Sequence, residues 1–467
     1  MSTGTDITIE TGTLRGAVHD GISHWLGIPF ASSPIGELRW RAPQPAVPWT
    51  GVRDATAYAH DPMQIPVDID AAPIGTTPSE DCLYANVWRP RGTAKLPVLV
   101  WIYGGGFVNG GSSPRTYTGA RLAADGLVVV SFNYRVGRFG TFAHKQLTAE
   151  GSDGGLIGNY GILDQIAALK WVQRNIAAFG GDASNITVVG ESAGGASIHM
   201  LLTSPLAQSL FHRAVIMSGG TGERTGSATL ADIEQLGEAF AAHNGIAPDD
   251  PDALSKLRAL SPAVIAGDLH LLTMTSHRPF TFAGPFVDGK IVVESGAAYA
   301  AGAFTRAPLM VGATSDDFDG KTGFMIGGAR RFSDRLSATG VPVYQYRFSY
   351  IAECLRNEPD QIGGGAKHAS DIPFFFNTQD IKYGDRTTPT DNEMGRLIST
   401  HLTQFAKTGD PSVDGAPWPR YTPGLNGILM DFTPDGHGIA AADPWAADID
   451  TSPARDYPDF LAMARSD

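Results

Sequence analysis

The stretch that decides the fold runs from 186 to 200 and reads Ile-Thr-Val-Val-Gly-Glu-Ser-Ala-Gly-Gly-Ala-Ser-Ile-His-Met. Its first four residues are typical of a buried strand, and the residues after Gly194 can start a helix. Between them, Gly190, Ser192 and Gly194 form a G-x-S-x-G pattern. Small flanking residues let the backbone turn sharply and lift the serine hydroxyl above the sheet edge, so the pattern predicts a nucleophile elbow with Ser192 as the nucleophile. The motif alone leaves open a glycine-rich turn whose serine only caps a helix.

A second glycine-rich segment lies upstream, where Gly104, Gly105 and Gly106 follow the apolar run 98–103. Backbone amides without a neighbouring Cβ can approach an anion closely. Enzymes with an elbow hold an oxyanion with amides from such a loop and with the amide after the nucleophile. We therefore predict Gly105, Gly106 and Ala193 as oxyanion donors. Taken by itself, the triplet also fits a flexible hairpin turn or a phosphate loop, although no Gly-Lys-Ser/Thr follows it.

Short apolar runs followed by Gly, Ser or Asn recur along the chain and are typical of buried strands. They lie at 98–103, 127–132, 186–189, 214–217, 309–311 and 343–348. The segment 162–172 repeats its apolar positions at i, i+3, i+4 and i+7, which predicts an amphipathic helix between two of these strands. Strand, helix and strand in succession indicate parallel pairing, so we predict an α/β fold with a mostly parallel central sheet flanked by helices.

The residue pattern changes after Gly220, where the Ala-rich segments 230–243 and 252–260 are separated by loops rich in Asp and Pro. These segments are expected to be helices of a cap-like insertion around 221–300. We find no internal repeat, low-complexity tract or Gly/Ser/Pro linker that divides the chain. The chain is therefore expected to form a single domain, 1–467, that carries this insertion.

The composition narrows the class of protein. The 467 residues include 35 Lys and Arg against 48 Asp and Glu, a net charge of −13, with no basic cluster, so a nucleic acid or an anionic membrane is not expected as a partner. No apolar stretch approaches the roughly 20 residues that span a bilayer. No export signal is visible at the N-terminus, although a trimmed one remains open. Cys82 and Cys354 cannot make a metal cluster or a disulfide framework, so we expect a cytoplasmic protein without a metal.

Several further motifs follow one another in a characteristic order. They lie at 27–31, 36–40, 43–45, 49–55, 80–87, 133–137, 161–165 and 179–182, ahead of the elbow. Together with the two glycine motifs, they resemble the type-B carboxylesterase/lipase family, the cholinesterase-like branch of the α/β-hydrolases. The resemblance runs nearly end to end and implies an α/β-hydrolase fold with helical cap insertions. It also implies a catalytic acid and a catalytic histidine, in that chain order, after the serine.

The acid is expected after the predicted strand 309–311. The resemblance places Asp317 where the family usually carries Glu followed by Gly. Asp can orient an imidazole as Glu does, but its side chain is one methylene shorter. The histidine loop must therefore lie nearer, or else Asp316 or Asp319 serves instead. We predict Asp317 as the acid and interpret the other two as a solvated loop.

Three histidines follow this acid in the sequence. His368 lies in a Gly-rich loop that resembles the family's catalytic-histidine segment, with Asp371 where the family usually has Glu. His401 falls in the apparently helical run 394–405 and is expected to be a packed or surface residue, and His437 lies in a Gly-rich turn. We therefore predict His368 as the catalytic base.

Two more residues match family positions without entering the predicted catalytic set. Ser218 is expected to be a hydrogen-bond partner near the site, or a plain residue at a strand end. Cys82 matches a position that forms a disulfide in secreted members, but this chain has no nearby second cysteine. We therefore interpret Cys82 as a small buried residue.

These assignments predict a serine hydrolase that cleaves small carboxylic esters of short to medium acyl chain through an acyl-enzyme on Ser192. Asp317 would orient His368, and the three backbone amides would hold the oxyanion. No cofactor is implied. An acyltransferase or an amidase would use the same acyl-enzyme, and a non-catalytic binding protein on the same fold is a further alternative. The oligomeric state is not indicated by the sequence.

Overall fold

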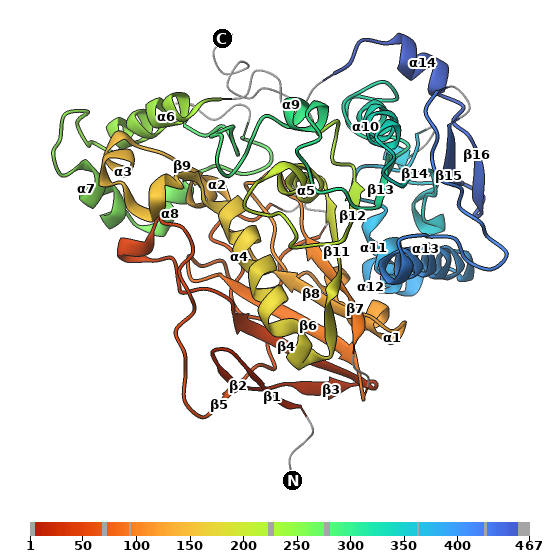
Figure 1. The fold of residues 1–467 in the computed structure, drawn as a ribbon, viewed down its shortest axis with the longest axis horizontal. Coiled ribbons are helices and arrows are strands. Elements are labelled where there is room, and N and C mark those ends of the chain that lie inside the picture. Colours follow the sequence, from red (N-terminus) through yellow and green to blue (C-terminus); the bar gives the residue numbers. More distant parts are fainter. Residues whose placement is uncertain are drawn as a thin grey trace.

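A mixed sheet of eleven strands forms the centre of the protein (Figure 1). The computed structural model describes residues 5–67, 72–92, 95–222, 228–274, 281–361, 364–424 and 427–455. In spatial order the strands are β16 (Gly438–Ala442), β15 (Ile428–Phe432), β14 (Val343–Phe348), β13 (Leu309–Thr314), β12 (Arg213–Met217), β11 (Gly181–Glu191), β7 (Leu96–Ile102), β8 (Val128–Phe132), β6 (Tyr84–Pro90), β4 (Ile22–Pro29) and β3 (Ala17–His19).

The seven strands from β15 to β8 in this order are all parallel to their neighbours. β16 at one edge and β6, β4 and β3 at the other are antiparallel. β8, β13 and β14 are buried along their whole length, which explains the apolar runs in β8 and β13, while β14 also buries Gln345 and Arg347. All six predicted strands are present, so the prediction of a mostly parallel sheet is confirmed.

The carboxyl ends of the parallel strands meet at one edge of the sheet. Glu191 at the end of β11 pairs with Met217 at the end of β12, and Met217 pairs with Gly312 on β13. The segments that follow these strands therefore leave the sheet side by side. This edge is where α/β folds usually place a binding site.

Long helices pack against this sheet. α4 (Tyr160–Asn175) and α5 (Ala193–Thr203) contact β11, α10 (Ile326–Ala338) contacts β13 and β14, and α13 (Pro389–Thr408) contacts β7 and β11. The predicted helix 162–172 lies within α4, but α4 is buried on nearly every side and exposes only Lys170 and Arg174. Its solvent-facing stripe is narrow because neighbouring segments cover most of the helix.

The described part of 221–300, where we expect the cap-like insertion, consists of helices joined by loops. It contains α6 (Leu230–His243), α7 (Ala253–Ala259), α8 (Pro262–Ala266) and α9 (Ser295–Ala300), while 223–227 and 275–280 lie outside the described residues. Thr229 and Asp232 form a capping box at the start of α6. In Figure 1, α6, α7 and α8 lie beside α2 (Gly137–Gly140) and α3 (Lys145–Glu150).

The remaining elements are short. β1 (Asp6–Ile9), β2 (Gly12–Arg15) and β5 (Val52–Asp54) form a three-stranded sheet, and β9 (Thr141–Phe142) pairs with β10 (Gly158–Asn159). The other α-helices are α1 (Ala120–Ala124), α11 (Ile372–Phe375), α12 (Gln379–Tyr383) and α14 (Ala446–Thr451).

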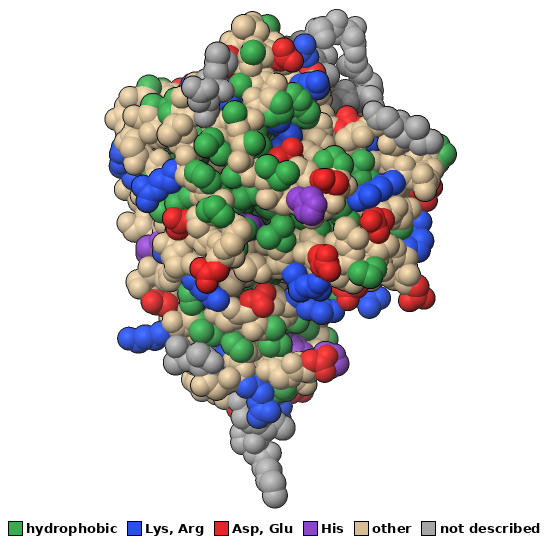
Figure 2. Space-filling model, turned by 90° about the vertical axis from the view of Figure 1, so that its right-hand side faces the viewer, with side chains coloured by type: hydrophobic (Ala, Val, Ile, Leu, Met, Phe, Trp, Pro, Cys, Tyr) green, Lys and Arg blue, Asp and Glu red, His purple; other side chains and the backbone are tan. Residues whose placement is uncertain are grey.

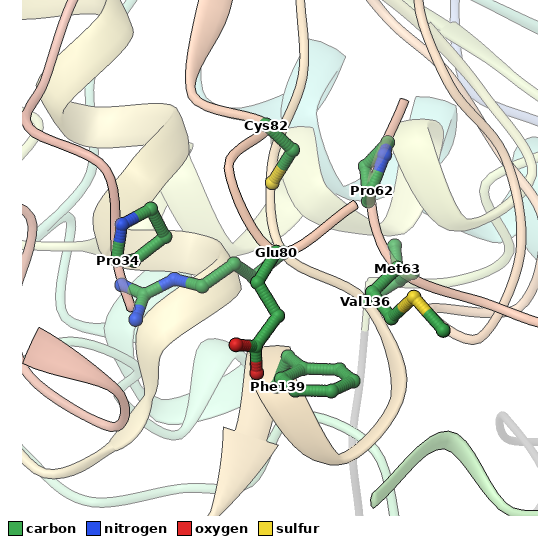
Figure 3. A pocket seen from close by; sticks show the side chains of 8 residues that line it. Pro34, Pro62, Met63, Glu80, Cys82, Val136 and Phe139 are labelled. Atoms are coloured by element: carbon green, nitrogen blue, oxygen red, sulfur yellow. The ribbon is translucent and has the colours of Figure 1, made fainter. Parts of the chain in front are cut away.

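Two buried ion pairs tie the N-terminal third of the chain together. Arg135 donates to both carboxylate oxygens of Asp164, each at 2.8 Å, and Arg39 pairs with Glu80 at 2.7 Å. Glu80, Arg135 and Cys82 are among the residues that line a small cavity, which Figure 3 shows with the Cys82 thiol pointing inward. Its volume, about 10 Å³, accommodates about one water molecule.

The side of the molecule that carries β16 and α14 has a mixed surface. Figure 2 shows acidic and basic side chains interspersed with hydrophobic ones on this face. Ile439, on β16, is 47% exposed. Among the described residues, no helix is both long and apolar enough to cross a membrane.

Candidate active site

Ser192 lies at a sharp turn between β11 and α5. Its backbone angles, φ 55° and ψ −120°, are unfavourable for any residue with a Cβ. The flanking glycines make the turn possible, because a Cβ on Gly190 would lie 2.5 Å from the carbonyl carbon of Gly194. A Cβ on Gly194 would lie 2.0 Å from the Ile102 carbonyl oxygen. The G-x-S-x-G spacing thus reflects two backbone contacts that exclude side chains.

The glycine triplet lies against this turn. A Cβ on Gly104 would be 2.9 Å from the Ser192 Cβ. Gly105 has φ +104° and Gly106 has φ +61°, so the loop uses the left-handed region that favours glycine. Ala193 is the first residue of α5, where a backbone N–H has no partner within the helix. In the described part of the chain, no group accepts a hydrogen bond from the amides of Gly105 and Gly106.

Asp317 follows β13 and is held from several directions. Its Oδ2 accepts hydrogen bonds from Ser218 Oγ at 2.6 Å and from Thr314 Oγ1 at 2.9 Å. Its Oδ1 accepts one from the Phe318 amide at 2.8 Å. Burial raises the pKa of Asp317, but His368 and these hydrogen bonds outweigh burial and lower it below its usual value. The carboxylate is therefore ionised at neutral pH.

His368 faces this carboxylate, with Nδ1 2.7 Å from Asp317 Oδ1. The short reach of an aspartate suffices because the histidine loop pairs directly with the acid loop. Asp316 and Lys367 form a parallel β-bridge, and the Asp316 amide donates to the Ala366 carbonyl at 2.9 Å. The histidine loop therefore lies near the acid, as the shorter side chain requires.

The other imidazole nitrogen of His368 faces Glu191, with Nε2 3.2 Å from Oε1. Burial lowers the pKa of His368, but the carboxylates of Glu191 and Asp317 outweigh burial and raise it to about 9. A third buried carboxyl, Asp371, accepts a hydrogen bond from the Tyr346 hydroxyl at 3.1 Å. Burial raises the pKa of Asp371 to about 7. The histidine therefore lies in an acidic environment.

The structure brings most of the predicted site residues together. Asp317 and His368 are hydrogen-bonded, and the glycine loop lies beside the Ser192 turn. Ser192 immediately follows Glu191, which His368 contacts. Within the described residues, however, the Ser192 hydroxyl has no hydrogen bond, and the expected contact from His368 to Ser192 is replaced by the contact to Glu191.

The rejected candidates lie elsewhere. Asp316 pairs with Lys367, and Asp319 pairs with Arg455 at 2.6 Å. His401 is buried in α13, where its Nδ1 lies 2.7 Å from the Pro411 carbonyl oxygen. His401 is therefore packed, which is one of the two positions expected for it.

Three other expectations have a clear outcome. His437 is exposed in the turn between β15 and β16. Ser218 donates to Asp317, as one of its two interpretations expected. Cys82 is a free, buried cysteine, which confirms that expectation.

Sequence reasoning did not assign roles to four neighbours of the acid and the histidine. Glu191 could have been noticed as the residue next to the predicted nucleophile, and Asp371 as a carboxyl three positions after His368. Phe318 could have been noticed beside the predicted acid, where the family usually has Gly. Thr314 carries no such signal, because only the tertiary structure shows that its hydroxyl contacts Asp317.

Among the described residues, no group of three or more His, Cys, Asp or Glu side chains could hold a metal ion. The polar groups at the site include the Ser192 hydroxyl, the His368 imidazole, a small set of carboxylates and free backbone amides, which suit acyl transfer through a serine.

A strand–serine–helix turn at the carboxyl edge of a mostly parallel sheet, with a glycine loop beside it and an acid–histidine pair after later strands, defines the α/β-hydrolase class. The comparisons agree. A model of the carboxylesterase family matches residues 3–327 and 320–437. A solved structure of PNB esterase superposes with a TM-score of 0.81 at 30% identity and covers 96% of this chain and 99% of that chain.

Two curated relatives similar in sequence are both named as esterases. Fumonisin B1 esterase of Sphingopyxis macrogoltabida is 39% identical over 356 residues, which are 75% of this chain and 61% of that protein. Para-nitrobenzyl esterase of Bacillus subtilis (strain 168) is 34% identical over 471 residues, which are 89% of this chain and 92% of that protein. The chain belongs to the carboxylesterase family and is a carboxylic ester hydrolase of the serine hydrolase type.

Proposed function

We propose that the protein hydrolyses small carboxylic esters through an acyl-enzyme on Ser192. His368 Nε2 takes the proton of the Ser192 hydroxyl as Oγ attacks the ester carbonyl carbon. The imidazolium then gives that proton to the leaving alcohol as the ester C–O bond breaks. A water molecule then gives a proton to His368 and attacks the acyl carbonyl carbon. The imidazolium returns this proton to Ser192 Oγ as the bond between Oγ and the acyl carbon breaks, which releases the carboxylic acid.

Asp317 holds His368 in the tautomer that leaves Nε2 free to accept a proton. The amides of Gly105, Gly106 and Ala193 stabilise the negative oxygen of the tetrahedral intermediate. For attack, the imidazole exchanges its contact with Glu191 for the Ser192 hydroxyl, and such hydrogen bonds are often loose until substrate binds. The observation that carries the proposal is the 2.7 Å contact between His368 Nδ1 and Asp317 Oδ1 at the sheet edge where Ser192 turns.

The test is Ser192→Ala, measured with p-nitrophenyl acetate and with a fluorophosphonate probe. We expect ester hydrolysis to fall on the order of 10⁴-fold or more and covalent labelling to disappear. The matched control is Ser197→Ala, one turn into α5, whose hydroxyl donates to the Ala193 carbonyl. A folded Ser192→Ala protein that keeps a tenth of the wild-type turnover contradicts the proposal.

We also propose a preference for short to medium acyl chains. The side chains of Leu271 and Met274 lie beside Gly106, and their ends would be 3.1 and 3.0 Å from a Cβ at that position. These apolar side chains limit the space beside the oxyanion loop. A panel of p-nitrophenyl esters tests the preference, which a steady rise in kcat/KM through long acyl chains contradicts.

We also propose a domain organisation and a cellular compartment for the protein. We place one α/β-hydrolase domain over 1–467, with a helical cap around 221–300. Two free cysteines fit a reducing, cytoplasmic compartment. Hydrolysis is favoured over acyl transfer because the named relatives are esterases.

A further inference from the structure

Phe318 is an aromatic residue in direct contact with the candidate histidine. It follows Asp317 in the chain, and its amide donates to Asp317 Oδ1. Its ring centre lies 4.2 Å from the centre of the His368 imidazole, with the two planes inclined at 34°. The family position after the acid usually holds a glycine, which has no ring to offer.

The ring remains open to solvent although it packs against a largely buried imidazole. Phe318 is 53% exposed, while the side chain of His368 is 16% exposed. One face of the ring therefore meets His368, and much of the rest forms an apolar surface beside the histidine. A large exposed aromatic surface at a site suits contact with a ligand better than contact with water.

The chemistry of the proposed reaction says which half of an ester this surface meets. The leaving oxygen must come within about 3 Å of His368 Nε2 to receive its proton. The alcohol half of the ester is therefore held beside the imidazole, within reach of groups that contact it. The carbonyl half is held at the glycine loop, where Leu271 and Met274 are the apolar neighbours of Gly106.

We propose that Phe318 forms a wall of the alcohol subsite and selects esters of flat, aromatic alcohols over esters of saturated alcohols of the same size. This inference rests on the proposed esterase mechanism. A flat ring in the alcohol can stack on Phe318 or meet its edge, and a puckered saturated ring makes a poorer contact. Phe318 acts on the choice of substrate and not on the bonds that form and break.

The experiment compares benzyl acetate with cyclohexylmethyl acetate, which share the acyl group and differ in the aromaticity of the alcohol. The readout is the ratio of the two kcat/KM values, because a general loss of activity leaves this ratio unchanged. We expect the wild type to favour benzyl acetate and Phe318→Ala and Phe318→Leu to lower the ratio about three- to tenfold. Phe318→Tyr should keep most of the wild-type preference for benzyl acetate, since it keeps the aromatic ring.

Ile439→Ala is the matched control, because Ile439 is also an exposed apolar residue but lies on β16. It should leave the ratio unchanged. If the Phe318 variants lose activity equally on both esters, or keep the wild-type ratio, Phe318 only supports His368 and the inference is overturned. Fluorophosphonate labelling separates the two failures: a wild type that neither labels nor hydrolyses either ester contradicts the proposed function itself.

Discussion

At the scale of single residues, the acid loop offers an internal test. Asp317→Asn should lower kcat about 10³- to 10⁴-fold, because an amide stabilises the wrong tautomer of His368. Asp316→Asn should stay within about tenfold of wild type, because Asp316 pairs with Lys367 and not with His368. Kinetics on p-nitrophenyl acetate with folded variants provide the measurement. If Asp316→Asn lost most of its kcat while Asp317→Asn kept it, the acid would have been assigned to the wrong residue.

The charge around His368 predicts an unusual pH dependence. Protonated His368 cannot accept the Ser192 proton, so kcat/KM should fall as the pH drops through the pKa of this histidine. Glu191 and Asp317 raise that pKa from 6.5 to about 9, so the fall should begin at distinctly alkaline pH. The measurement is the pH profile of kcat/KM on an ester of neutral acid and alcohol.

Glu191→Gln supplies the control for this profile. Removing a negative charge 3.2 Å from Nε2 lowers the pKa of His368, so the acidic limb should move to lower pH. A wild-type limb at or below pH 6.5, or a limb that Glu191→Gln does not move, argues against this account of the charge.

At the scale of elements, the oxyanion loop depends on two glycines to different degrees. A Cβ on Gly105 would lie 2.3 Å from the Asn109 carbonyl oxygen, at φ +104°. A Cβ on Gly106 would meet the flexible ends of Met274 and Leu271, at 3.0 and 3.1 Å, and would add only the backbone strain of φ +61°. A backbone clash must move the loop, whereas side-chain ends can shift aside.

We therefore expect Gly105→Ala to lower kcat about 10²-fold or more, the scale of losing one oxyanion donor. Gly106→Ala should cost about tenfold at most. Circular dichroism checks that both variants fold, and steady-state kinetics measure the difference. Equal losses of kcat in the two variants would contradict this account, because they would show that the type of neighbouring atom does not decide the effect of an added Cβ.

At the scale of the whole molecule, the pair Arg135–Asp164 ties the segment after β8 to α4. Both side chains are almost fully buried, at 3% and 0% exposure. Asp164→Ala leaves the Arg135 charge buried without its partner and should cost about 3–5 kcal/mol of unfolding free energy. Urea denaturation measures this loss.

The exposed pair of Arg121 and Asp380 is the comparison for that measurement. Its side chains are 52% and 41% exposed, so Arg121→Ala should change the unfolding free energy by no more than about 1 kcal/mol. Similar losses in Asp164→Ala and Arg121→Ala would show that burial does not set the strength of the inner pair.

The sequence by itself determined the central strands, the turn at Ser192 and the glycine loop. These features are local: buried parallel strands need continuous apolar runs, and a strained turn needs small residues at fixed spacing. The choice of Asp317 and His368 came from resemblance, because the two residues are separated in the chain and no local pattern joins them.

Only the tertiary structure decided how these residues meet. The bridge between Asp316 and Lys367 brings an aspartate within reach of His368, and the chain fold places Glu191 and Phe318 against the same imidazole. Contacts between distant segments depend on how strands and loops pack, and that packing sets burial and electrostatic interactions together. The pKa of His368 and the aromatic surface beside it are therefore properties of the fold, not of any one stretch of sequence.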